Sequence, residues 1–496
     1  MAKIYVFGIG GTGSRVLRAL TMLLASGMDC GDADTVVPII IDVDGAGGDV
    51  TRVRNLMECY GNIRRTLTFT ENQKNKFFRT KIEDIGDERF LITLQNTGET
   101  FQEYIKWDKG GLTNENKALA KVLFSERDLR SNMEMGFKGY PHIGSVVMNQ
   151  LEDSPVYQNF VNNFAAGDRI FIISSIFGGT GASGFPLLLK KMRKSENQLI
   201  SRAEIGAITV LPYFKVAPQR NSAIDSTTFI SKMKSALLYY NRTIYNNNDL
   251  DYSYYIADNE ATTYSNYEGG VLQKNNAHFV ELAAALAVLD FAKSNRNPRN
   301  QQNERQTCFK EFKDATDNNN NVDFLILQDD YFNLLKKSMT QFILLAKFMD
   351  EAYDYWHQPW IKCSKIKSDF FAEQNSFITN LREFLCQYRH WLAEQSTQNR
   401  NFAPFMVKYH LDKQNEIVLE KSSSKELFKV VNGIEPSTDW QSLDTDYNLF
   451  NNYLNHVSFF GKCEGSNSQQ FMELFYLATE RIIKRKIKVL DLNNND

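Results

Sequence analysis

Two glycine-rich turns, each placed directly after a short aliphatic run, constrain this chain more than any other feature. GIGGTG spans residues 8–13 and follows the run Ile4–Phe7, while FGGTGASG spans residues 177–184 and follows Ile170–Ile176. A buried strand that breaks into glycines and then into a helical pattern is half of a parallel βαβ unit. Backbone amides can converge on phosphate oxygens at such a turn, because glycine has no Cβ to obstruct the approach.

Aliphatic runs recur at Val36–Ile41, Glu204–Val210 and Tyr252–Ile256. Parallel strands that are buried on both faces have this continuous rather than alternating pattern. We therefore predict an α/β fold over residues 1–275, built on a doubly wound, mostly parallel sheet. The segment 276–295 is rich in Ala and Leu, and it is predicted to be a long, well-buried central helix.

The remainder of the chain has a different composition. Residues 296–330 contain SNRNPRNQQNERQ and DATDNNNNVD, and these Asn-rich stretches predict a surface loop or insertion. Three helical patterns and one hairpin pattern follow, at 332–353, Phe370–Leu392, Gln470–Lys486 and Met406–Leu419. Residues 331–496 are therefore predicted to form a mainly helical domain. The Met- and aromatic-rich stripe of its first helix is either core or a face that binds a partner.

Composition limits the classes of function. At 496 residues the chain is long enough for two or three domains, and its formal net charge is −2. This balance argues against nucleic acid or an anionic membrane as the main partner, because no basic excess is available to neutralise phosphates. The six cysteines form no CxxC pair, which argues against a disulfide framework and a zinc site. The first residues lack a signal-peptide pattern and no run of about 18 apolar residues occurs, so we expect a cytoplasmic protein without a membrane span.

The first glycine turn, taken alone, fits a dinucleotide-binding Rossmann domain. Gly8, Gly10 and Gly13 match GxGxxG, and Asp42 or Asp44 after the second strand would then bind the ribose of NAD. In such an oxidoreductase the second glycine turn would be only a tight strand-to-helix connection. A Walker-type phosphate loop does not fit, because no GxxxxGK[ST] occurs. Two glycine turns that face one another would instead enclose a nucleoside triphosphate.

Six segments in a fixed order resemble the nucleotide loops of the tubulin/FtsZ superfamily of GTPases. FGIGGTGSRVL is similar to the family loop GxGGxGxNxV, IDVDGAG to its Asn-Thr-Asp turn, and FGGTGASG to GGGTG(S/T)G with Phe177 in place of the first glycine. MGFKGYPHIGS has the spacing of the family's third loop, LPYFKVAPQR supplies Pro212 and Arg220, and YIADNE places Asn259 at a Pro-Asn position. The resemblance covers residues 1–295 and is to divergent bacterial tubulin-like proteins rather than to a cell-division FtsZ.

The resemblance implies a site for GTP or GDP with Mg²⁺ between the facing loops. It nominates as nucleotide-binding residues Gly10, Gly11, Thr12, Gly13, Asp44, Lys138, Gly139, Gly178, Gly179, Thr180, Gly181, Ala182, Ser183, Arg220, Asn259, Asn276 and Glu281. Thr180 and Ser183 would add hydroxyl donors, and Lys138 and Arg220 would place cations beside phosphates. Asp44 would act on Mg²⁺ through water, since a bare carboxylate repels phosphate.

Recognition of the base is assigned to residues near the start of the central helix. Glu281 or Asn276 would recognise guanine, because a carboxylate accepts two hydrogen bonds from that base. His278 and Glu281 fit equally well as hydrogen-bonded residues of the helix start.

In tubulin and FtsZ filaments an acidic residue of the neighbouring subunit completes GTP hydrolysis. Glu304 and Asp323 are the candidates here, and Val216 stands where FtsZ has its ribose-binding Glu. The resemblance thus predicts a GTPase, slow or dependent on assembly, that self-associates head to tail into filaments. The alternative is a non-polymerising nucleotide-gated switch in a bacterial stress or phage-defence system, with a protein partner bound by the helical C-terminal region.

Overall fold

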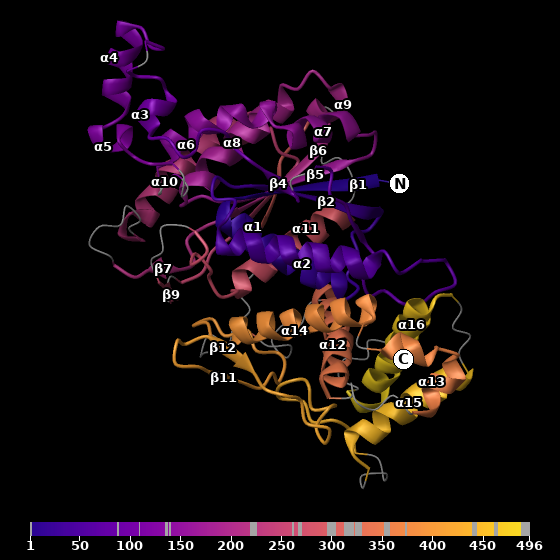
Figure 1. Cartoon of the computed structure of the whole chain (residues 1–496). Helices are drawn as coiled ribbons and strands as arrows, with labels where there is room; N and C mark the ends of the chain where they lie inside the picture. The colour runs from indigo at the N-terminus through magenta and orange to yellow at the C-terminus, as the bar shows by residue number, and fades with distance from the viewer. Residues whose placement is uncertain are drawn as a thin grey trace.

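The computed structural model describes residues 2–86, 89–108, 110–133, 137, 140–218, 226–259, 262–265, 270–294, 304–311, 322, 330–351, 358–372, 374–438, 444–460 and 465–487. Within these ranges the chain forms a layered α/β domain, and a mainly helical region from the last third of the chain packs beneath it (Figure 1). The predicted doubly wound α/β architecture is confirmed, and so is the helical character of the C-terminal region.

One parallel sheet runs through the centre of the α/β domain. Its strands lie in the order β10-β8-β6-β5-β1-β2-β3, β4 pairs with the end of β2, and these pairings are all parallel. The strands are β1 (Ala2–Ile9), β2 (Ala33–Ile41), β3 (Lys81–Ile82), β4 (Leu91–Ile92), β5 (Arg169–Ser175), β6 (Glu204–Val210), β8 (Tyr252–Ile256) and β10 (Cys308–Glu311). β5 and β6 are buried along their whole length, which is why their sequences are dominated by apolar residues without alternation.

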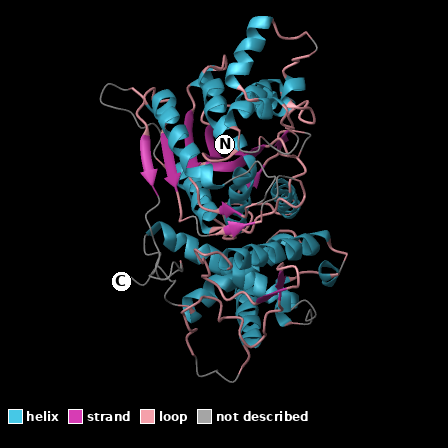
Figure 2. Ribbon diagram, turned by 90° about the vertical axis from the view of Figure 1, so that its left-hand side faces the viewer, coloured by secondary structure: helices cyan, strands magenta, loops and turns pink. Residues whose placement is uncertain are grey.

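Helices cover both faces of this sheet (Figures 1 and 2). One face carries α1 (Gly10–Ala25), α2 (Gly48–Arg64) and α11 (Phe279–Lys293). The other carries α6 (Pro141–Val147), α7 (Pro155–Asn163), α8 (Gly179–Arg193), α9 (Gln198–Ser201) and α10 (Phe229–Tyr240). The helix α11 is the predicted central helix. It is buried almost all round because α1 and the strands β6 and β8 contact it.

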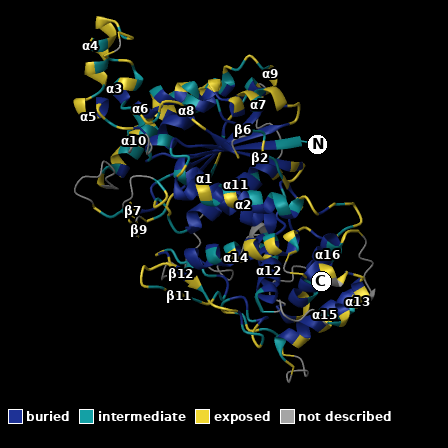
Figure 3. Cartoon of the chain, viewed as in Figure 1, coloured by how far each residue is buried: buried dark blue, intermediate teal, exposed yellow. Residues whose placement is uncertain are grey.

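Smaller elements extend from the α/β domain. The helices α3 (Phe101–Tyr104), α4 (Asn114–Leu123) and α5 (Glu126–Leu129) project as an arm, and α4 has no buried residue (Figure 3). Short parallel strands β7 (Lys215–Val216) and β9 (Thr263–Tyr264) pair outside the main sheet. Four further short helical turns are η1 (Met148–Asp153), η2 (Ser226–Thr228), the π-helical η3 (Asn241–Tyr245) and η4 (Ser368–Phe371).

The C-terminal region is a cluster of helices with one hairpin. Its elements are α12 (Asp330–Glu351), α13 (Pro359–Ser364), α14 (Ser376–Ser396), α15 (Asp446–Phe460), α16 (Asn467–Lys486), β11 (Tyr409–Leu411) and β12 (Ile417–Leu419). The antiparallel pair β11-β12 confirms the predicted hairpin. In the apolar stripe of α12, Leu335, Met339 and Phe342 are fully buried, so this stripe is core rather than an exposed partner-binding face. The helix α14 packs against α2 and joins the two parts of the molecule (Figure 1).

Segment 296–330 differs from its prediction in one respect. The sequence predicts only a loop or insertion there, but Cys308–Glu311 form β10, which pairs in parallel with β8. The residues of β10 alternate between half-buried and exposed, as on the edge of a sheet. The strand is therefore held by backbone pairing with β8. Its sequence contains no aliphatic run, so the sequence does not predict it. Most other residues of the segment lie outside the described part of the chain.

Two glycines of GIGGTG lie where α1 packs closely on β1, and the packing requires the second of them, Gly13. A Cβ on Gly13 would lie 2.4 Å from the carbonyl carbon of Gly8, and a Cβ on Gly8 would lie 2.6 Å from Cδ1 of Leu17. The first turn of α1 therefore rests directly on strand backbone. Unlike the end of a flexible side chain, that backbone cannot move aside at low cost.

We expect Gly13→Ala to destabilise the fold by about 1–3 kcal/mol, the usual cost of overpacking a closely packed site. Gly61→Ala is the matched control, because Gly61 lies inside α2 and a Cβ there would meet nothing within 4 Å. The control should be stabilised by about 0.5–1 kcal/mol, since alanine is the better helix former. Urea unfolding of both variants measures the difference. Equal changes in stability would contradict the packing argument.

Candidate functional site

The sheet has a topological switch point between β1 and β5. These two strands are neighbours, with Gly8 opposite Ile173, yet the chain leaves them in opposite directions. From β1 it passes through α1 to β2 on one side, and from β5 it passes through α8 to β6 on the other side. Because α1 and α8 lie on opposite faces of the sheet (Figure 1), the carboxyl ends of β1 and β5 form the switch point, which we call the crevice. Ligands of doubly wound α/β proteins bind at such a crevice.

The two glycine turns meet at this crevice. Gly10 has a φ of +72°, which an L-residue with a side chain rarely adopts. A Cβ built on Gly10 would lie 3.5 Å from the Cβ of Thr180 and 3.8 Å from the amide nitrogen of Gly181. The predicted juxtaposition of GIGGTG and FGGTGASG is therefore present in the fold.

The two helices that begin at the crevice, α1 and α8, have no side chain that caps their first backbone N–H groups. The N-cap residues are Ile9 for α1 and Gly178 for α8, and neither has a side chain that could accept a hydrogen bond. Neither helix has an acidic residue in its first turn. The unpaired N–H groups and the positive ends of the two helix dipoles thus converge on one place. This arrangement favours an anion such as phosphate.

The hydroxyl groups of the two turns are placed differently. Thr180 is half-buried beside Gly10. Ser183 is fully buried, and its hydroxyl donates to the carbonyl oxygen of Gly179 at 2.7 Å, within the first turn of α8. Thr12 is also buried, and its hydroxyl accepts a hydrogen bond from Arg15 at 3.3 Å. In this arrangement Thr180 is the better placed of the two hydroxyls that the sequence nominates as donors to phosphate.

Two aspartates lie at the carboxyl end of β2. The Asp42 carboxylate accepts the amide of Asp44 at 3.2 Å, and burial raises the pKa of Asp42 to about 7. The Asp44 side chain accepts the amide of Gly270 at 2.6 Å, so it ties the β2–α2 turn to the loop that leads into α11. Either residue occupies the position that the sequence assigns to a ribose contact or to a water-mediated Mg²⁺ contact.

Arg15, in the second turn of α1, is the centre of a buried polar cluster. Its guanidinium donates to Glu281 at 2.5 Å, to Asp49 at 2.6 Å and to the hydroxyl of Tyr213 at 2.8 Å. Tyr213 donates in turn to Glu281 at 2.7 Å. The Arg15, Asp49 and Glu281 side chains are each at most 5% exposed, so these charges are balanced by one another rather than by water.

The cluster continues into the C-terminal region through Glu394 of α14. Arg18 of α1 donates to both oxygens of this carboxylate, at 2.6 and 3.1 Å, and Arg52 of α2 donates at 3.2 Å. The backbone amide of Ala277, just before α11, donates to it at 2.8 Å. Burial opposes ionisation of Glu394, but the two guanidinium groups outweigh burial and lower its pKa.

Sequence reasoning missed Glu394 and the role of Arg18. The available signal is that each charged residue falls at a position that the spacing of its helix assigns to the buried side. Glu394 continues the three- and four-residue spacing of the buried stripe of α14, and Arg18 lies in a helix that is buried almost throughout. Charged residues at such positions are nearly always paired, but the sequence does not identify the partner.

Glu281 and Asn276, the candidates for base recognition, have structural partners. The Glu281 carboxylate accepts Arg15, Tyr213 and the backbone amide of His278, and so completes the capping box of α11. Burial lowers the pKa of His278 to about 4, which keeps the ring neutral and able to accept the amide of Val280. The carbonyl of Asn276 accepts the Tyr264 hydroxyl at 2.9 Å. The contacts of Glu281 and His278 favour the structural interpretation that the sequence left open for these two residues.

The remaining nominated residues lie elsewhere. Asn259 is exposed after β8, and Val216 is half-buried in β7. Glu304 is exposed and precedes β10, and its neighbour Arg305 pairs with Asp251, which immediately precedes β8. Glu304 is thus at the amino edge of the sheet, opposite the crevice. Four nominated residues lie outside the described part of the chain, namely Lys138, Gly139, Arg220 and Asp323.

Within the described residues, no group of three or more His, Cys, Asp and Glu side chains is arranged as a metal centre. None of the helices in those ranges combines the length and apolar character that crossing a bilayer requires.

The geometry thus defines a doubly wound α/β protein with an anion-favouring crevice at its switch point. No family model matches the chain, and no curated protein matches it. Among solved structures it is similar to CetZ2 from Haloferax volcanii, described as a GTPgS-bound protofilament, with 13% sequence identity and a TM-score of 0.30. The match covers 61% of this chain and 61% of that chain, less than two thirds of that protein's length.

The buried carboxyl group of Asp42 predicts a pH dependence of stability. Its pKa is about 7 in the fold and about 4 in an unfolded chain, so between these values the folded state holds the extra proton. Stability should therefore fall as pH rises from about 4 to about 7, by up to about 1.4 kcal/mol per pH unit from this group. Asp42→Asn lacks this titrating group, so the stability of the variant relative to the wild type should increase as pH rises over this window. Thermal unfolding at several pH values measures the difference. A stability difference independent of pH would contradict this assignment.

Removing the charge of Glu394 should be costly. Glu394→Gln leaves the buried Arg18 without its carboxylate and removes one of the two carboxylate partners of Arg52, and we expect a loss of about 3–5 kcal/mol in the free energy of unfolding. Glu416→Gln is the matched control, because Glu416 is 62% exposed and pairs with Lys274 at 3.8 Å. The control should change stability by less than about 1 kcal/mol. Comparable urea midpoints for the two variants would show that the cluster does not hold the two regions together.

Proposed function

We propose that this chain is a tubulin-like GTP-binding protein, and that its nucleotide phosphates occupy the crevice between GIGGTG and FGGTGASG. The observation that carries the proposal is the meeting of two glycine turns and two helix N-termini at Gly10 and Thr180. One anion-binding helix N-terminus suffices for a dinucleotide fold. Two that face each other suit the more highly charged phosphate chain of a nucleoside triphosphate.

In this proposal the residue that holds Mg²⁺ comes from the end of β2. Asp44 lies beside the crevice, and it would hold Mg²⁺ through water while one of its oxygens keeps the amide of Gly270. Bound Mg²⁺ would neutralise charge that develops on the phosphates. Lys138 and Arg220 remain the proposed cations for the terminal phosphate.

Hydrolysis and filament formation belong to the same proposal. The crevice opens at the carboxyl edge of the sheet, and Glu304 is at the amino edge. A subunit stacked head to tail would bring the amino edge of one copy toward the crevice of the next. Such heterologous contacts generate open filaments. Glu304 or Asp323 would then complete the neighbour's site, and the isolated subunit would hydrolyse GTP slowly.

A second function is favoured by the buried cluster. Arg15 and Arg18 connect the first turns of α1 to Glu281 and Glu394, and hence the crevice to the C-terminal region. A non-polymerising switch would use this connection to expose a partner-binding surface when the nucleotide binds. Size-exclusion chromatography with and without GTP separates this switch from a filament former.

The nucleotide itself is identified by mass spectrometry of the purified protein and by titration with a fluorescent GTP analogue, in competition with GTP, ATP and NAD. GDP or GTP in the preparation, and displacement by GTP alone, support the proposal. Displacement by NAD alone would establish the Rossmann oxidoreductase, which the strand order and Asp42 also fit. Sedimentation and phosphate release with GTP then test assembly, and a monomer that releases no phosphate would refute a polymerising GTPase.

Gly10→Ala should weaken nucleotide binding by about tenfold or more, since a side chain at this φ strains the turn and would occupy space beside Thr180. Gly110→Ala is the matched control, because Gly110 has a φ of +71° but lies in open space on the arm. Both substitutions strain the backbone, yet only the first changes the crevice. Fluorescence titration with the GTP analogue measures the two affinities, and an equal loss in both variants would disprove the assignment of the crevice.

A further inference from the structure

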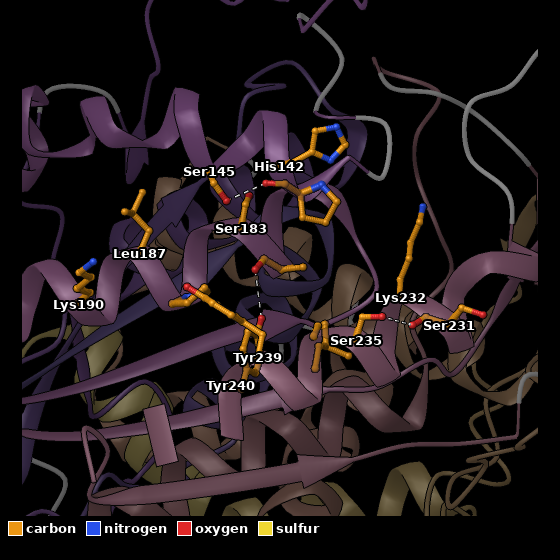
Figure 4. A pocket seen from close by; sticks show the side chains of 15 residues that line it. His142, Ser145, Ser183, Leu187, Lys190, Ser231, Lys232, Ser235, Tyr239 and Tyr240 are labelled. Atoms are coloured by element: carbon orange, nitrogen blue, oxygen red, sulfur yellow. Dashed lines mark hydrogen bonds between the residues drawn. The ribbon is translucent and has the colours of Figure 1, made fainter. Parts of the chain in front are cut away.

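A second cavity lies beside the crevice, between α6, α8 and α10 (Figure 4). Its volume is about 550 Å³, within the range of small-molecule sites. It shares Ala182 and Ser183 with the glycine turn FGGTGASG and extends along α8 past Leu187 to Lys190. None of the functions considered above uses this cavity.

Specific packing between the three helices forms this cavity. Pro186 interrupts α8 and has no N–H for the carbonyl of Ala182, and the hydroxyl of Tyr240 donates to that carbonyl at 3.3 Å instead. The Tyr240 ring also packs against Phe185, with ring centroids 5.2 Å apart. These contacts hold the end of α10 against α8. On the other side a Cβ on Gly144 of α6 would lie 2.3 Å from Oγ of Ser183, so α6 is equally close to α8.

The lining has an apolar wall and polar groups at its rim. Ile176, Leu187, Ala236 and the rings of Tyr239 and Tyr240 supply the apolar surface. Four serine hydroxyls and three basic side chains accompany them, namely Ser145, Ser183, Ser231, Ser235, Lys190, Lys232 and His142. None of the described lining residues is acidic. An apolar wall with a few polar groups is the usual composition of a small-molecule site.

The charge of the rim selects the sign of the ligand. Lys190 is exposed at the end of the cavity formed by α8, and within the described residues its ammonium group enters no ion pair. Its neighbours on the helix differ, because Lys191 pairs with Glu152 and Arg193 with Asp251. Lys232 adds a second positive charge from α10 (Figure 4). His142 faces Asp128 at 3.4 Å, whereas Lys190 forms no ion pair within the described residues.

From this chemistry we infer that the cavity binds an amphipathic organic anion, in which an aromatic or aliphatic body lies against Leu187, Ala236 and Tyr239 and an acidic group faces Lys190. Apolar burial would supply most of the affinity, and the lysine would supply the preference for an anion. The inference holds whichever ligand the crevice binds.

The test uses two naphthalene probes that differ by one sulfonate. Anilinonaphthalene sulfonate is the anion, and N-phenylnaphthylamine is its uncharged counterpart. Ala236→Trp fills the cavity and should abolish one saturable sulfonate site in a fluorescence titration. Leu238→Trp is the matched control, because Leu238 lies on the same helix but is 53% exposed. Retention of the site in Ala236→Trp, or its loss in the control, would overturn the assignment of the cavity.

A second variant keeps the test decisive if Ala236→Trp does not fold. Lys190→Gln changes an exposed side chain and should weaken the sulfonate probe up to about fivefold, the value of a partly exposed ion pair. Binding of the uncharged probe should stay unchanged. If both probes weaken equally, or if neither changes, Lys190 does not select an anion and the inference fails.

Discussion

The buried charge cluster beneath the crevice is the interaction on which the rest of the structure depends. It balances three guanidinium groups against three carboxylates, from Arg15, Arg18, Arg52, Asp49, Glu281 and Glu394. Buried ions are tolerated only with well-placed partners, because desolvation of an unpaired charge costs several kcal/mol. The helices α1, α2, α11 and α14 must therefore dock in one arrangement. That arrangement fixes α1, and with it the glycine turn at its start.

The crevice follows from chain direction rather than from any single side chain. All pairings of the main sheet are parallel, so the turns after β1 and β5 emerge at the same edge. The chain then turns to opposite faces, and the two helix N-termini converge without side-chain caps. Glycine at positions 8 and 13 lets α1 approach the strand closely. The electrostatic character of the site is thus a property of the backbone.

The segment FGGTGASG serves two places at once. Its glycines and Thr180 border the crevice, while Ala182 and Ser183 lie in the first turn of α8 and line the neighbouring cavity. Tyr240 binds the carbonyl that Pro186 leaves unpaired, which locks α10 beside this same turn. The helix α8 therefore has the crevice at its N-terminus and the neighbouring cavity along its side.

The sequence by itself determined the five long strands of the sheet, the glycine turns and the helical C-terminal region, because aliphatic runs, glycines and apolar spacing are local signals. It also predicted that GIGGTG and FGGTGASG face one another, since parallel strands end at a common edge. Only the tertiary structure decided what Glu281 and Glu394 do. Arg18 and Glu394 are 376 residues apart, and their contact depends on how α14 packs against α1 and α2. The edge strand β10 and the cavity beside α8 likewise arise from packing between distant segments, which no local pattern encodes.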